Sequence, residues 1–207
     1  MKITQKVFIL IAAATLLLSI SCDPKKNTNT NSAITKGVAP IADKEIAVIE
    51  MENSAAFGKI KLELYSNIAP KMVARFKELA NEGFYNGTTF HRINNDVIQG
   101  GDPNSKDADP NNDGMGHSDK KDVPAEFSDI PYDTGILGAA RSMDINSANC
   151  QFFITLHRVA GFDEKYTIFG KVIEGMGNVR TISGVQPKER ERPVEDIKIR
   201  SITFESR

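Results

Sequence analysis

Alternating apolar and polar positions dominate the chain after residue 45. The clearest case is the segment 59–65, where Ile60, Leu62 and Leu64 alternate with lysine and glutamate, as in a strand with one buried face. Similar short runs predict further strands over 46–51, 88–93, 97–100, 136–140, 152–156, 167–172 and 197–204. We expect the first two strands to pair as a hairpin.

Two segments follow the helical period instead. Apolar residues recur at three- and four-residue spacing from Met72 to Ala80, Pro70 suits the first helical turn, and Gly83 ends the pattern. A shorter helix is expected over 176–183. Many short strands with two helices predict a mainly β fold, a closed barrel with capped ends.

The first 22 residues have the pattern of an export signal. A positively charged start, Met1 to Lys6, precedes an apolar run from Val7 to Ile20, which is shorter than the roughly 20 residues of a membrane-spanning helix. We expect residues 1–21 to be a signal peptide. Leu18 to Cys22 also resembles a bacterial lipoprotein cleavage site, which predicts lipidation of Cys22 and a membrane-anchored protein of the bacterial cell envelope, periplasmic or surface-facing. The alternative is an ordinary secretory leader with a chance cysteine.

The composition of the rest of the chain indicates a linker followed by one domain. Residues 23–43 are rich in polar residues and lack apolar periodicity, so we expect a flexible linker over 22–44 and a single domain over 45–207. The whole chain carries 26 basic and 27 acidic side chains, and this balance argues against nucleic acid as a partner. Only two cysteines occur, Cys22 and Cys150, and they do not predict a disulfide framework.

Four short blocks carry the candidate chemistry: Phe90-His91-Arg92, Gln99-Gly100-Gly101-Asp102, Gly135-Ile136-Leu137 and Gln151-Phe152-Phe153-Ile154. Their order and approximate spacing resemble those of cyclophilins, a family of peptidyl-prolyl cis/trans isomerases, and the resemblance runs from about Glu45 to Phe204. It implies an eight-stranded antiparallel barrel with a helix at each end, and catalysis of X-Pro bond rotation without a metal or cofactor. Proline-containing polypeptides are the implied partners, and we expect the domain to act as a monomer.

Arg92 is the candidate catalytic residue. Amide resonance opposes rotation about an X-Pro bond with a barrier of about 18–20 kcal/mol. A donor aimed at the prolyl nitrogen stabilises the twisted state, in which that nitrogen keeps its own lone pair, more than the planar state. A guanidinium suits this task because it stays protonated and holds its N–H groups in a rigid fork. A lone arginine is more often a solvated surface charge, so this assignment depends on all four blocks together.

The same resemblance implies roles for the other site residues. Gln99 and Gln151 match the glutamines that orient the arginine and bond the substrate backbone. Phe153 and Val97 match the apolar seat of the proline ring, and we assign Phe153 to the catalytic group. The remaining predicted substrate contacts are His91, Ala140, Arg141, Phe162 and Tyr166. Taken one at a time, such residues could equally serve the core or ordinary hydrogen bonding.

The segment between Arg92 and Gln99 departs from the family pattern. It has six residues where the family usually has seven, and Asp96 stands at the counted position of a pocket phenylalanine. Because a carboxylate in an apolar pocket would suffer a desolvation cost of a few kcal/mol, we expect Asp96 to lie outside and the pocket to be shallow. This departure keeps open an alternative function, a catalytically weak cyclophilin-like module that binds peptides or acts as a chaperone.

The loop 109–114 offers a competing signal. Its first, third and fifth positions carry oxygen ligands and its sixth is glycine, as in calcium loops, but Lys120 replaces the glutamate expected at the twelfth. Turn-forming residues account for the same letters without an ion. A calcium-dependent adhesion or scaffold module built on residues 103–123 is therefore a third, weaker hypothesis, and we expect no metal.

Overall fold

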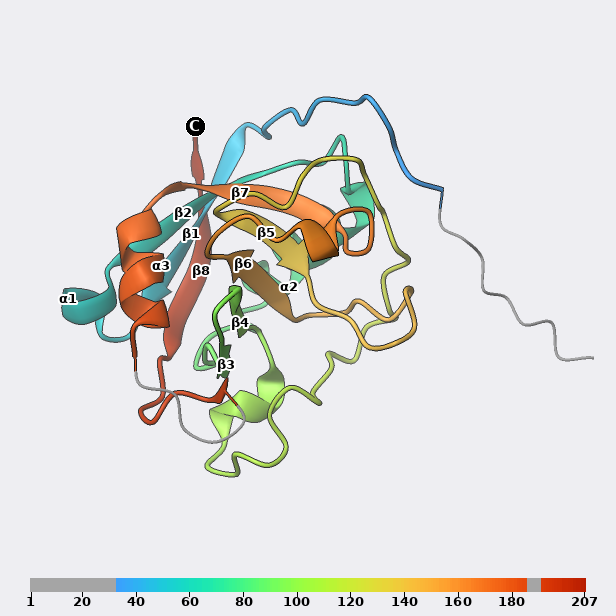
Figure 1. The fold of residues 1–207 in the computed structure, drawn as a ribbon. Helices are drawn as coiled ribbons and strands as arrows, with labels where there is room; N and C mark the ends of the chain where they lie inside the picture. The colour runs from blue at the N-terminus through green and yellow to red at the C-terminus, as the bar shows by residue number, and fades with distance from the viewer. Residues whose placement is uncertain (1–32, 186–190) are drawn as a thin grey trace, which may run out of the picture. The chain divides into compact units, whose positions relative to one another are not determined.

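One antiparallel sheet of eight strands frames the domain in the computed structural model, which describes residues 33–185 and 191–207 (Figure 1). The order of the strands across the sheet is β3-β4-β6-β5-β7-β2-β1-β8. The strands are β1 (Glu45–Met51), β2 (Lys59–Leu64), β3 (Arg92–Ile93), β4 (Val97–Gly100), β5 (Ile136–Ala139), β6 (Phe152–Thr155), β7 (Ile168–Glu174) and β8 (Ile199–Ser206). The mainly β prediction and the antiparallel pairing of the first two strands are confirmed.

Closure of the barrel is limited to a few bonds between the two edge strands. An isolated antiparallel bridge joins Thr89 to Lys198, just before β3 and β8 begin. Beside it, the Phe90 amide donates to the Ile197 carbonyl at 3.0 Å. The eight-stranded antiparallel sheet therefore matches the prediction. The predicted closed barrel overstates how far hydrogen bonds join the two edges of the sheet.

The strand predicted over 88–93 is much shorter in the structure and retains only Arg92–Ile93. The Thr89 amide donates to Ser105 Oγ at 2.9 Å, and the Thr88 hydroxyl donates to the Tyr85 carbonyl at 2.7 Å. These bonds place Thr88 in a turn and tie Thr89 to a neighbouring 3-10 helix. The ladder consequently starts at Arg92, beside the candidate site.

Both predicted α-helices form at the expected positions. The helices of the described residues are α1 (Ser54–Phe57), α2 (Pro70–Asn81), α3 (Met176–Ser183) and the 3-10 helices η1 (Pro103–Lys106) and η2 (Ala160–Phe162). Helix α2 packs against β7 and β8, and α3 packs against β2 and β4. Helix α1 lies in the connection between the first two strands, where the sequence pattern indicated no helix.

Strand β6 links the core to the candidate site. Neighbouring residues of a strand face opposite sides of the sheet, and Phe152 enters the main core, where it packs edge-on against Phe76 with ring centroids 5.6 Å apart. Phe153 lies on the other side, in a smaller apolar cluster with Tyr132 and Val97. The dense packing of the first face thus holds the second face in place.

The segment before β1 is attached to the domain. The Thr35 amide donates to the Phe127 carbonyl at 2.9 Å, and the Asp129 amide donates to the Thr35 carbonyl at 3.1 Å. Nearby, Asp43 accepts a hydrogen bond from Lys77 Nζ at 2.9 Å. The predicted flexible linker over 22–44 is therefore too long at its C-terminal end, because these backbone bonds cannot be inferred from a polar composition.

The predicted signal peptide and Cys22 lie outside the described residues. Within the part of the chain that the structure describes, no helix combines the length and hydropathy needed to cross a bilayer.

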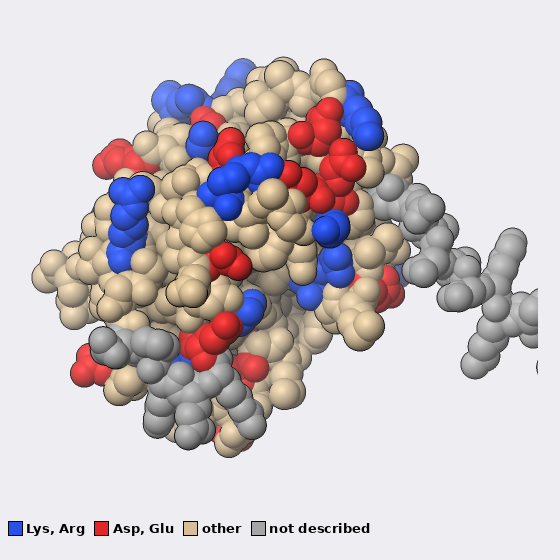
Figure 2. Space-filling model, in the orientation of Figure 1, with Lys and Arg blue, Asp and Glu red and all other residues tan. Residues whose placement is uncertain are grey.

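Charged side chains of both signs are interspersed on the face shown in Figure 2. Several charged side chains of the described residues form ion pairs, such as Lys61 with Glu174 at 3.3 Å and with Glu205 at 2.9 Å. This face presents no broad region of single sign, unlike a typical nucleic-acid-binding surface.

Glu126 caps the start of α2 from another part of the chain. The residue before the helix, Ala69, provides no side-chain cap, and the Glu126 carboxylate instead accepts the amides of Lys71 at 3.1 Å and Met72 at 3.0 Å. We expect Glu126→Ala to lower the free energy of unfolding by about 1–2 kcal/mol, because it leaves two helix N-terminal donors without this partner. Urea unfolding followed by circular dichroism measures the change.

The matched control is Glu52→Ala, which removes an exposed carboxylate for which the described residues show no hydrogen bond. It should leave the unfolding midpoint unchanged. Equal midpoints for both variants would show that the cap contributes nothing.

Candidate active site

A small cleft opens on the face of the sheet opposite the main core. Its volume is about 90 Å³. The hairpin of β3 and β4, the end of β5, strand β6 and the loop 160–166 each contribute to it. The lining residues are Arg92, Val97, Gln99, Ala140, Arg141, Phe153, Phe162 and Tyr166, and all eight were predicted as site residues from the sequence.

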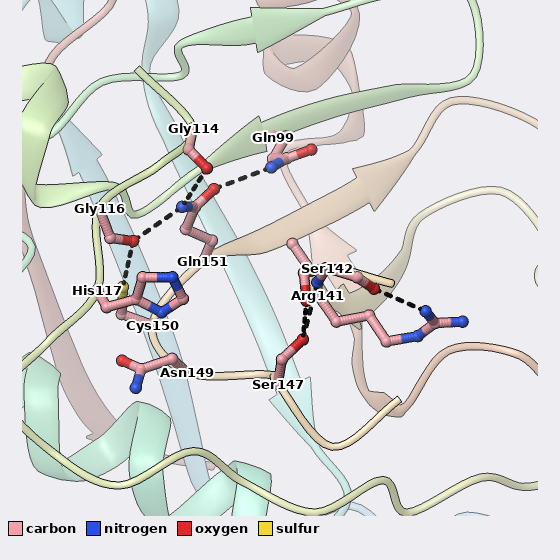
Figure 3. A pocket seen from close by; sticks show the side chains of 11 residues that line it. Gln99, Gly114, Gly116, His117, Arg141, Ser142, Ser147, Asn149, Cys150 and Gln151 are labelled. Atoms are coloured by element: carbon pink, nitrogen blue, oxygen red, sulfur yellow. Dashed lines mark hydrogen bonds between the residues drawn. The ribbon is translucent and has the colours of Figure 1, made fainter. Parts of the chain in front are cut away.

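A chain of hydrogen bonds holds the Arg92 guanidinium at one side of this cleft. Arg92 Nη1 donates to Gln99 Oε1 at 3.2 Å, and Gln99 Nε2 donates to Gln151 Oε1 at 3.0 Å. Gln151 Nε2 in turn donates to the carbonyls of Gly114 and Gly116, both at 3.0 Å (Figure 3). Both amide orientations are thereby fixed, so that Gln99 presents its oxygen to the arginine. Gln151 itself stands just outside the cleft.

Aromatic rings form the opposite side of the cleft. The Phe153 ring is only 4% exposed and stacks on Tyr132 with centroids 5.8 Å apart. Phe162 and Tyr166 meet the same ring edge-on, at 5.6 and 5.7 Å. The three rings packed around Phe153 leave its side chain little freedom, so the apolar surface that faces Arg92 is preformed.

Arg141 is held at the rim of the cleft. Its guanidinium carbon lies 4.5 Å from the centroid of the Tyr166 ring, and Nη2 donates to the Lys165 carbonyl at 2.9 Å. Figure 3 shows this side chain extending away from Gln151. The neighbouring Ala140 amide donates to the Gln151 carbonyl at 3.0 Å, so this amide is already used within the sheet.

A cation beside an apolar slot is the arrangement that the sequence predicted for catalysis of X-Pro bond rotation, and the cleft has it. Residues 48–204 match the family described as cyclophilin type peptidyl-prolyl cis-trans isomerase/CLD. The chain belongs to this family.

Proteins named as peptidyl-prolyl cis-trans isomerases and a solved cyclophilin resemble the chain over most of its domain. Peptidyl-prolyl cis-trans isomerase-like 1 of Mus musculus is 40% identical over 152 residues, which cover 70% of this chain and 85% of the relative. A probable peptidyl-prolyl cis-trans isomerase of Brucella suis is 44% identical over 130 residues, or 60% of this chain and 66% of the relative. A solved Cryptosporidium parvum cyclophilin, crystallised in the presence of the dipeptide Ala-Pro, superposes with a TM-score of 0.70 at 28% identity and covers 78% of this chain and 99% of that one.

The connection between β3 and β4 of this cyclophilin is tight at the position counted for a pocket phenylalanine. Asn94 Oδ1 accepts the amides of Asp96 and Val97, both at 2.9 Å. The Asp96 side chain is 45% exposed, and its Oδ1 lies 3.1 Å from His157 Nε2. Asp96 therefore lies outside the cleft, as expected, and Val97 alone of the connection lines it.

A second cleft of about 110 Å³ shares Gln99, Ala140 and Arg141 with the first, and Figure 3 shows the residues that line it. Sequence reasoning missed several of its lining residues, among them His117, Ser147 and Asn149, because they lie in loops without a recognisable motif. Cys150 also borders it, and burial raises the pKa of this thiol to about 12, so it stays protonated and is not a nucleophile.

A wider cleft beside Arg92 is lined by His91 and by residues of the loop 109–114, which suggested a calcium site. His91 is 4% exposed, and burial lowers its pKa, which keeps it neutral near pH 7. Asp113, the fifth position of the calcium pattern, forms an ion pair with Arg192 instead. Burial raises the pKa of Asp113 to about 6 despite the opposing pull of Arg192. Through these contacts the loop supports the site, and they do not favour calcium binding.

Gly138 makes room for the Phe153 ring. The two residues are directly opposite each other on β5 and β6, and a Cβ at position 138 would lie 2.6 Å from Cε2 and 2.9 Å from Cε1 of that ring. We expect Gly138→Ala to displace the ring and to lower kcat/KM about tenfold, with a loss of about 1–3 kcal/mol in the free energy of unfolding. NMR exchange on an Ala-Pro peptide and urea unfolding measure the two effects.

Gly161→Ala provides the control at the rim of the same cleft, because an added Cβ there meets no atom within 4 Å. It should retain wild-type activity and stability. If Gly138→Ala retained them as well, the ring position would not matter for the reaction.

Proposed function

We propose that this cyclophilin accelerates the cis/trans rotation of X-Pro bonds in exported polypeptides and so assists their folding. The observation that supports the proposal is the position of Arg92, which Gln99 holds at the edge of a cleft walled by Phe153. A proline ring placed against Phe153 would bring its amide nitrogen to the guanidinium. The solved relative crystallised with Ala-Pro supports the same class of ligand.

Two physical effects lower the rotation barrier in such a cleft. A charge-assisted hydrogen bond to the lone pair of the twisted nitrogen contributes about 1.5–3 kcal/mol, or roughly ten- to a hundredfold in rate. The apolar rings add to this effect, because the planar amide is polarised by resonance and loses more solvation than the twisted amide when water is excluded. Neither effect needs proton transfer or a covalent intermediate.

Arg92→Lys tests the role of the guanidinium at constant charge. An ammonium is more strongly hydrated and lacks the rigid fork, so we expect kcat/KM to fall about tenfold or more, and about a hundredfold for Arg92→Ala. Exchange measurements by NMR on an Ala-Pro peptide give these rates. Arg200→Lys is the control, because Arg200 lies on β8 and contacts Glu50 and Glu52 instead of the cleft.

Equal exchange rates for wild type and Arg92→Ala would refute this mechanism. The alternative function, a catalytically weak module that binds peptides or acts as a chaperone, is favoured by the missing pocket phenylalanine at the connection of Asn94 to Val97. It would gain support if the peptide bound to both proteins while neither accelerated exchange.

We also propose that the protein is a lipoprotein of the bacterial cell envelope, attached through Cys22 and acting as a monomer on proline-containing clients. The charged start, the short apolar run and the cysteine at residue 22 support this proposal.

Mass spectrometry of the mature full-length protein tests the anchor. We expect an N-terminal Cys22 with added acyl mass and recovery in the membrane fraction, because several buried acyl chains bind a bilayer stably. Cys22→Ser should lose both properties while keeping the isomerase activity. An unmodified residue 22 in the wild-type protein would disprove lipidation.

A further inference from the structure

Glu191 reaches the candidate catalytic arginine from a distant part of the chain. Its Oε2 accepts a hydrogen bond from Arg92 Nε at 2.6 Å and another from Asn94 Nδ2 at 3.3 Å. The two partners of the first bond are 99 residues apart. Glu191 lies in none of the four sequence blocks.

This contact and the bond to Gln99 together hold the Arg92 guanidinium from two sides. Gln99 accepts from Nη1 at 3.2 Å, while Glu191 accepts from Nε at 2.6 Å. Among the described residues, Nη2 has no hydrogen-bond partner. The two bonds thus fix the plane of the guanidinium and leave Nη2 as the donor available to a substrate in the cleft that Arg92 lines.

An adjacent ion-pair network anchors the segment that carries Glu191. Arg192 pairs with Asp113 and, at 2.9 Å, with Asp196. The Arg192 and Asp113 side chains are only 13% and 8% exposed. Glu191 itself has a φ of 64°, in the left-handed region that residues other than glycine rarely adopt. Such a conformation persists where its surroundings enforce it, and it is found most often at functional sites.

We propose that Glu191 is a positioning residue that orients Arg92 for catalysis. An arginine side chain rotates about several bonds, and a catalytic donor that is already oriented avoids losing that freedom at the moment of reaction. Both side chains of the pair are close to half exposed, at 44% and 43%, so water screens the carboxylate charge. Glu191 therefore directs the guanidinium without cancelling its charge toward the cleft. This inference rests on the proposed isomerase function.

Three variants of the full-length protein test the proposal by NMR exchange on an Ala-Pro peptide. Glu191→Ala should lower kcat about tenfold with KM changed less than about twofold, because orientation is lost while the binding cleft remains. Glu191→Gln should recover most of the activity, since its amide oxygen still accepts from Nε. In the Arg92→Lys background, Glu191→Ala should have no further effect, because no guanidinium remains to be oriented.

Glu195→Ala is the matched control, since it removes an exposed carboxylate from the same segment without contact to Arg92. It should retain wild-type kinetics, and all variants should keep the wild-type melting temperature. Glu191→Ala with activity equal to or above wild type would overturn the proposal, and so would an equal loss in the Arg92→Lys background. A wild-type protein that fails to accelerate exchange would instead refute the isomerase function on which the proposal rests.

Discussion

One row of opposed residues across four strands builds the candidate active site. Arg92 pairs with Gln99, Gln99 with Phe153, and Phe153 with Gly138. Opposed residues of antiparallel strands share one face of the sheet, so the donor, the amide that orients it, the apolar ring and the space for that ring come together. A slip of one residue would turn a strand's side chains to the other face, and the cleft would no longer form.

The loop before β5 supports this row from outside the sheet. The carbonyls of Gly114 and Gly116 hold Gln151, and Asp113 holds Arg192. The loop therefore fixes the glutamine chain that ends at Arg92, and it holds the arginine next to Glu191, the other partner of Arg92. Oxygens that suggested an ion-binding loop are engaged by the protein itself: Asp109 Oδ1 accepts the Asn111 amide, and Asp113 pairs with Arg192.

The electrostatics of the site match a reaction that transfers no proton. Burial keeps the Cys150 thiol protonated and the His91 ring neutral near pH 7, so neither supplies a charge beside the cleft. Arginine side chains stay protonated in proteins, so a guanidinium supplies a fixed charge. What the fold contributes is the direction of that charge, through hydrogen bonds that a flexible surface arginine would lack.

The sequence by itself determined the features that depend on local periodicity and on motif spacing. The alternation around Ile60 located β2, and the three- and four-residue spacing after Pro70 located α2. The motif blocks contain three residues of the cleft, Arg92, Gln99 and Phe153, and the family resemblance supplied the other five. Only the tertiary structure decided contacts between segments with no shared pattern. The bond of Glu191 to Arg92, the partial closure at Thr89 and the attachment of Thr35 to the domain are of this kind. Such contacts depend on how distant segments pack, and no local period in the chain encodes them.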